Sequence, residues 1–171
     1  MMKLAVVAVL VGCVTSNIAF ADTSAPLGKW AAFSDRTPKG TPLCALAAAP
    51  TAGQTVRNIS VKKFGGNEHL NVTMYKDSWK IPQGTSVMTT IDFADGQPMT
   101  LESYGDGKIV DVALPKEVTA LFLSLLIDSK VMRISFPRGK EPTWEASLAS
   151  IRPGMKAFID CMRKQEDTQP F

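Results

Sequence analysis

The chain has few of the residue types that carry catalytic or metal chemistry. Its 171 residues include one histidine, His69, and three cysteines, Cys13, Cys44 and Cys161. A structural zinc site needs about four Cys and His ligands, and a histidine base needs a nucleophile within hydrogen-bond reach. The sequence also has no Gly-x-Ser-x-Gly elbow and no phosphate-binding Gly loop. We therefore predict no catalytic residue, no metal site and no cofactor, and we do not expect an enzyme.

Strong positive charge and long apolar runs are missing as well. The chain has nineteen Lys and Arg residues and sixteen Asp and Glu residues, which gives a formal net charge of +3. This balance does not favour a nucleic-acid partner, which needs a concentrated basic face. The apolar run Leu4 to Val11 is too short to cross a bilayer, which takes about 20 residues. We expect no transmembrane segment in the mature chain.

The first 21 residues are typical of a bacterial Sec-type signal peptide. Lys3 gives a positive start, the apolar run follows, and Ala19-Phe20-Ala21 forms a small-x-small cleavage site. This order predicts a periplasmic or secreted protein. Leu10-Val11-Gly12-Cys13 also resembles a lipobox, so a lipid anchor on Cys13 is the alternative. We disfavour it because the signal would be very short and apolar residues 18–21 would lie in a normally polar tether.

Cleavage of the signal leaves two cysteines in an oxidising compartment. Cys44 and Cys161 form an even pair, which favours a disulfide there. Closing a loop of about 100 residues stabilises a fold by roughly 4–5 kcal/mol in the chain-entropy model. Two buried free thiols are the alternative.

Short strand-like segments separated by turn residues dominate the rest of the chain. Gly65-Gly66-Asn67, Asp95-Gly96 and Asp106-Gly107 are typical of hairpin turns. A helix is predicted from Pro115 through Leu126, and a second from near Pro153. We predict a mainly β fold, an antiparallel β-sandwich or flattened barrel with one inserted and one C-terminal helix. Its nine or so strands cover 28–34, 43–48, 56–64, 70–75, 87–93, 99–104, 109–114, 131–136 and 144–148.

This pattern indicates one domain in the mature chain. The β-rich domain covers residues 28–165, after a flexible leader at 22–27 and before a frayed tail at 166–171.

One aromatic residue stands apart from the predicted strands. Trp79 lies in a connection between Lys76 and Lys80. Large aromatic residues usually anchor a core, which is our first interpretation of Trp79. The alternative is an exposed recognition residue flanked by two cations, so Trp79, Lys76 and Lys80 are the candidate recognition residues.

Several hydrophobic segments and turns follow one another in a characteristic order. They are Trp30 followed by Cys44, Ile81-Pro82-Gln83-Gly84 leading through Val87 to Ile91-Asp92, Tyr104, Ile109-Val110-Asp111-Val112, 121–126, 131–136, and Ser147-Leu148 running into Ala157-Phe158. This layout resembles the invasion-associated locus B family of exported proteobacterial proteins. The resemblance implies a small β-rich periplasmic or surface-associated domain linked to host interaction and virulence, and it supplies no catalytic residue. Further cysteines typical of the family near Tyr104 to Ile109 are absent here.

Three functions agree with these features. The first is a non-catalytic exported accessory protein that binds another envelope or secretion protein. The second is a small-ligand-binding or inhibitor module that uses an open end of the fold. The third is an enzyme with an unrecognised acid-based site, which would need buried acids with shifted pKa values. The sequence does not fix the oligomeric state.

Overall fold

The computed structural model describes residues 27–49, 57–94 and 97–167. The predicted signal peptide, Cys13, the Asp95-Gly96 turn, and leader and tail residues 22–26 and 168–171 lie outside the described residues. The elements in chain order are β1 Lys29–Arg36, β2 Pro42–Ala49, β3 Arg57–Phe64, β4 Leu70–Lys76, β5 Ile81–Phe93, β6 Met99–Gly107, β7 Ile109–Leu114, α1 Lys116–Asp128, β8 Val131–Ser135, β9 Trp144–Ser147 and α2 Ile151–Asp167.

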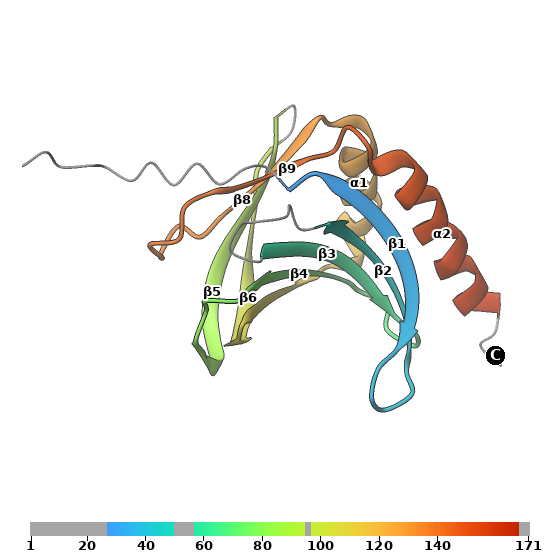
Figure 1. Ribbon diagram of the computed structural model, residues 1–171, viewed down its shortest axis with the longest axis horizontal. Coiled ribbons are helices and arrows are strands. Elements are labelled where there is room, and N and C mark those ends of the chain that lie inside the picture. The colour runs from blue at the N-terminus through green and yellow to red at the C-terminus, as the bar shows by residue number, and fades with distance from the viewer. Residues whose placement is uncertain (1–26, 50–56, 95–96, 168–171) are drawn as a thin grey trace, which may run out of the picture.

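The nine strands form one strongly curved antiparallel sheet (Figure 1). Their order across the sheet is β1-β2-β3-β4-β7-β6-β5-β8-β9. Leu27, just before β1, forms a parallel bridge with Ala146 in β9, so the two ends of the sheet meet there. The Leu27 amide donates to the Glu145 carbonyl, and the Ser147 amide donates to the Leu27 carbonyl. This nearly closed barrel with two helices confirms the predicted fold class.

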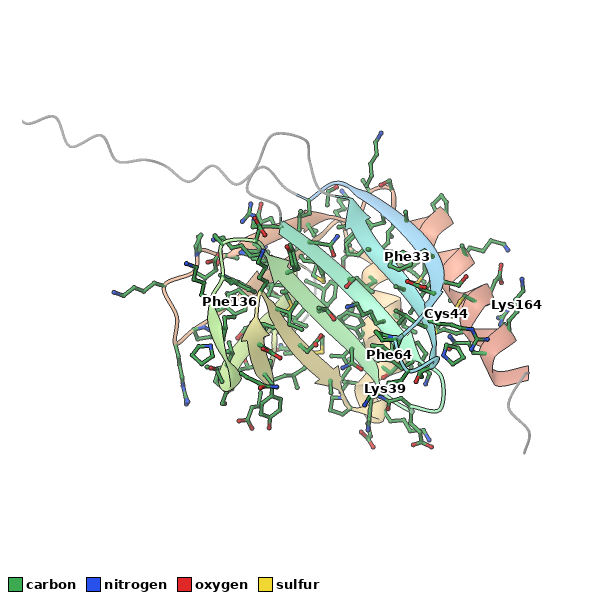
Figure 2. The ribbon with its side chains drawn as sticks, turned by 60° about the horizontal axis from the view of Figure 1, so that its bottom comes forward. Phe33, Lys39, Cys44, Phe64, Phe136 and Lys164 are labelled. Atoms are coloured by element: carbon green, nitrogen blue, oxygen red, sulfur yellow. A yellow bond between two sulfur atoms is a disulfide. The ribbon has the colours of Figure 1, made fainter. Side chains whose placement is uncertain are left out.

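One face of the sheet is continuously apolar. Residues paired across antiparallel strands project to the same face, and Val61, Val72 and Val112 follow one another across β3, β4 and β7. All three are fully buried. Both helices cover this face, because Gly154 of α2 lies against Leu46 and α1 places its Phe122 ring against Phe93. In Figure 2 strands β1 to β4 lie in front, α1 lies behind them, and α2 lies beside β1 on the right.

Two of the predicted hairpin turns are confirmed. The first joins β3 to β4, where Gly66 has φ +77° and the Asn67 amide donates to the Phe64 carbonyl. The second joins β6 to β7, where Gly107 has φ +57°. Residues other than glycine rarely adopt such φ angles, which explains why these Gly residues mark the turns.

Several predicted boundaries differ from the structure. Strand β5 begins at Ile81, not Val87, because Pro82 and Gly84 interrupt the apolar pattern without ending the strand. A bulge between Ile81 and Thr85, with Gly84 at φ +75°, absorbs the interruption. Leu27, assigned to the leader, is only 4% exposed. Helix α2 begins at Ile151, and it includes residues 166–167, which were assigned to the tail.

The predicted disulfide joins β2 to α2. Cys44 is fully buried on the apolar face, and its Cα atom lies 5.9 Å from that of Cys161. The bond fixes the last turns of α2 to a strand 117 residues earlier in the chain.

Neither helix of the described part is long and apolar enough to cross a membrane.

Candidate functional site

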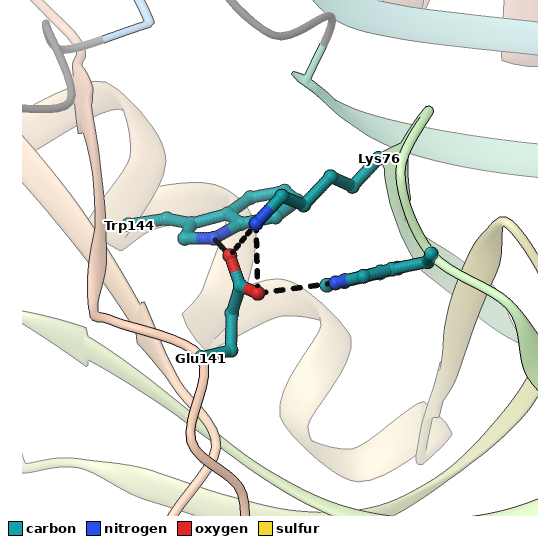
Figure 3. Close-up of polar contacts among 4 residues, drawn as sticks. Lys76, Glu141 and Trp144 are labelled. Atoms are coloured by element: carbon teal, nitrogen blue, oxygen red, sulfur yellow. Dashed lines mark hydrogen bonds and ion pairs between the residues drawn. The ribbon is translucent and has the colours of Figure 1, made fainter. Parts of the chain in front are cut away.

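The carboxylate of Glu141 holds together two segments that are far apart in sequence. Glu141 lies in the connection between β8 and β9, and Lys76 lies at the end of β4. The Lys76 ammonium donates to both Glu141 oxygens, at 2.8 and 2.9 Å. The indole N–H groups of Trp79 and Trp144 donate to the same carboxylate at 3.1 and 2.9 Å (Figure 3). Three donors therefore fix one half-buried carboxylate.

The charge of Glu141 is stabilised by this arrangement. Partial burial alone would raise the pKa of its carboxyl group, because burial disfavours the charged form. Hydrogen bonds from Lys76, Trp144 and Trp79, together with the charge of Lys76, outweigh the burial and hold the pKa below its usual range. Glu141 is therefore an ionised anchor at neutral pH.

The two indoles belong to a stacked aromatic cluster. The rings of Trp79 and Trp144 are stacked with centroids 5.2 Å apart, and Phe136 contacts both rings edge-on, at 5.7 and 6.1 Å. The guanidinium of Arg57 lies 5.3 Å from the centre of the Trp144 ring. Arg57 is only 8% exposed, so this is a cation–π contact in a largely desolvated setting. The cluster holds the Trp79 ring in one orientation.

A pocket of about 400 Å³ opens beside Trp79. Its floor includes Val87 and Val110, which project from the apolar face of the sheet. The bulge in β5 separates Ile81 from the regular ladder at this point. The pocket is thus a place where the apolar face reaches the surface. Its lining consists of Trp79, Ile81, Thr85, Ser86, Val87, Met88, Val110, Phe136, Arg138, Gly139, Lys140 and Glu141.

The rim of the pocket is positively charged. Arg138 and Lys140 are exposed, and neither forms an ion pair within the described part of the chain. Glu141 also lines the pocket, but Lys76 already neutralises its charge. The pocket therefore combines an aromatic and aliphatic interior with two cations at its mouth.

The structure brings together two of the three candidate recognition residues. Trp79 and Lys76 meet on Glu141, whereas Lys80 is exposed and outside this cluster. Trp79 packs against the core within the aromatic cluster and also lines the pocket. A role of Trp79 in recognition stays a prediction. Sequence reasoning missed Glu141 and Phe136. Only the charged turn Arg138-Gly139-Lys140-Glu141 marked this region, and nothing in the sequence linked it to residue 79.

The histidine lies outside the Glu141 cluster. His69 is exposed, and its backbone amide donates to the side chain of Asn67 in the β3–β4 turn. Among residues 27–49, 57–94 and 97–167, no three His, Cys, Asp or Glu side chains are placed to hold a metal ion.

No family model, no curated protein and no solved structure matches this chain. The resemblance to the invasion-associated locus B family therefore stays a prediction.

Proposed function

We propose that this protein is an exported, non-catalytic accessory protein that works by binding, with the pocket beside Trp79 as its recognition site. One observation carries the proposal: the wall of the pocket is a partly exposed indole that a stack, an edge contact and a hydrogen bond hold in place. A preformed apolar pocket with a few oriented polar groups is the usual form of a binding site. Because the Trp79 ring is already ordered, binding a ligand does not cost the conformational entropy of fixing it.

The lining indicates the chemistry of the ligand. Ile81, Val87 and Phe136 suit an apolar chain or ring, and the unpaired cations of Arg138 and Lys140 suit an acid group at its end. Thr85 and Ser86 also line the pocket, where their hydroxyls donate to the Pro82 carbonyl and to the Glu102 carboxylate. An amphipathic anion, free or at the end of an envelope component, fits this arrangement.

Binding is favoured over catalysis by the state of the one partly buried acid in the site. Glu141 has three donors and a lowered pKa. A general acid at neutral pH needs the opposite shift, and a general base needs a free lone pair directed at a substrate. The carboxylate is used to hold the site together.

Export rests on the signal-like N-terminus and is supported by the disulfide, since such bonds persist in oxidising compartments. The intact mass of the protein purified from its native host, with a thiol count under denaturing conditions, tests this part. We expect a chain starting at Asp22 with no free thiol. A chain that retains residues 1–21 and has free thiols would overturn export.

Decanoate is a suitable probe for the pocket, with decyltrimethylammonium as a control that has the same chain and the opposite charge. The indole N–H signal of Trp79 in ¹H–¹⁵N NMR spectra should shift with decanoate and not with the control. Replacing two exposed cations by alanine, Arg138→Ala with Lys140→Ala, should weaken decanoate binding roughly 2- to 30-fold, because each surface ion pair contributes about 0.2–1 kcal/mol.

The matched control removes the same charge elsewhere. Arg152 and Lys156 are exposed on α2 and do not line the pocket. Arg152→Ala with Lys156→Ala should leave decanoate affinity within about twofold of the wild type. An equal loss of decanoate affinity in both double variants would attribute the binding to net charge. Equal shifts of the Trp79 signal with both amphiphiles would attribute it to the alkyl chain. Either result would overturn the proposed site.

A further inference from the structure

One end of the sheet has an edge that no other strand covers. Within residues 27–49, 57–94 and 97–167, β2 is the only strand that pairs with β1 along its length. The bridge to β9 involves Leu27, before β1 begins. β1 is eight residues long, and its second half, Phe33–Arg36, is exposed. Such an edge is a template for another strand.

The hairpin that follows β1 shows which backbone groups face outward. The Thr37 amide donates to the Thr41 carbonyl. In an antiparallel pair, alternate residues direct both backbone groups to the partner strand. The N–H and C=O groups of Phe33 and Asp35 therefore point to β2, and those of Ala32 and Ser34 point away from it. The Arg36 amide agrees with this phase, because it donates to the side chain of Asp35 and not to β2.

A groove of about 890 Å³ runs along this edge and has α2 as its second wall. Five consecutive residues of β1, 32–36, line it, together with Pro42 and Leu43 at the start of β2. Consecutive residues belong to opposite faces of a sheet, so the groove includes the edge of β1, and near the β1–β2 turn it also reaches β2. The α2 residues form one stripe of the helix at i, i+3, i+4, i+7 and i+8: Ala157, Asp160, Cys161, Lys164 and Gln165.

The two walls match in length. The strand from residue 32 to residue 36 spans about 13 Å, and the helical stripe from 157 to 165 spans about 12 Å. In the view of Figure 2, Cys44 lies between Phe33 on β1 and Lys164 on α2. The disulfide therefore fixes the position of the helical wall relative to the strand.

We infer that this groove binds an extended peptide segment of another protein, which adds to the sheet as a strand beside β1. The chemistry of the edge selects the occupant: the outward N–H and C=O groups of Ala32 and Ser34 pair best with an extended backbone. Ala32 lines the groove from β1 and Ala157 lines it from α2, and both side chains are small, which leaves room for side chains of the segment. This surface is independent of the pocket beside Trp79.

A second copy of the chain fits the groove less well. Pairing β1 with β1 of another copy would bring a second α2 to the same edge. Both helices would then have to occupy the space beside one pair of strands. A single extended segment needs only the groove between β1 and α2.

The test uses a phage library of random heptapeptides panned against the full mature protein. The most enriched sequence is then made as a fluorescent peptide, and its affinity is measured by fluorescence anisotropy. Ser34→Pro removes an outward N–H without removing a hydrogen bond to β2, and Ser34→Ala keeps that N–H as the matched control. Ala157→Trp fills the groove from the helix side, and it is the second test variant if Ser34→Pro does not fold.

We expect the peptide to bind the wild type and Ser34→Ala alike, and to bind Ser34→Pro and Ala157→Trp about 10-fold or more weakly. The Ser34 amide should also exchange with solvent more slowly when the peptide is bound. Failure to enrich any sequence, or equal affinity for all folded variants, would overturn the inference. A wild-type dimer that Ser34→Pro converts to monomers would assign the edge to a second copy and would also overturn it.

Discussion

Removing the carboxylate of Glu141 should destabilise the fold far more than removing a neighbouring exposed one. In Glu141→Ala the indole N–H of Trp144 loses its acceptor, and Trp144 is only 1% exposed, so water cannot replace the acceptor easily. A buried donor without a partner costs about 1–3 kcal/mol. Lys76, whose side chain is 18% exposed, can turn toward water, which adds at most about 1 kcal/mol.

The expected loss of unfolding free energy is therefore about 1–4 kcal/mol. For a domain of this size it lowers the melting temperature by roughly 2–15 °C. Thermal and urea unfolding of the disulfide-intact protein, followed by circular dichroism, measure the change. The control is Glu145→Ala, because Glu145 pairs with Arg133 where both side chains are more than 40% exposed. That variant should lose less than about 1 kcal/mol.

The pH dependence gives the same prediction a second test. The pKa of Glu141 is lower in the folded protein than its usual value of 4.5. Its stabilising effect is therefore complete above that usual value and is lost as the pH falls through the lowered pKa. The stability difference between wild type and Glu141→Ala should shrink in that acidic range. A loss below about 0.5 kcal/mol at neutral pH, or a difference that does not shrink in acid, would refute the reasoning.

Two further predictions concern the attachment of α2. Cys161→Ser should lower the free energy of unfolding by about 2–5 kcal/mol, measured by urea denaturation; equal stability of the oxidised and reduced wild type would contradict this. Gly154→Ala should cost about 1–3 kcal/mol, because the new methyl group would lie 2.9 Å from Leu46 and 3.2 Å from the carbonyl oxygen of Trp30. Gly139→Ala, where the nearest atoms are 3.5 Å away, is the control, and an equal loss there would refute close packing as the cause.

Local sequence patterns predicted much of the fold because short-range chemistry determines them. Gly66 and Gly107 mark turns through their positive φ angles, and the apolar spacing of the 116–128 segment identifies a helix. The start of β5 was wrong because a bulge at Gly84 lets a strand continue through Pro82, which a simple alternation rule does not allow.

The candidate site was only partly predictable, since it depends on contacts between distant segments. Trp79 and Lys76 were found from their own neighbourhood in the sequence. Glu141 lies 62 residues from Trp79 in the chain, and no periodicity or motif relates the two positions. The groove along β1 was equally hidden, because the order of strands determines which edge remains free.

Intermolecular nuclear Overhauser effects between decanoate and the protein test the pocket most directly. Our account predicts contacts from the alkyl protons to the rings of Trp79 and Phe136, and their loss in Val87→Trp, where a large side chain fills the pocket. Contacts confined to exposed aromatic residues elsewhere, such as Phe33 and Tyr104, or contacts that persist in Val87→Trp, would contradict it.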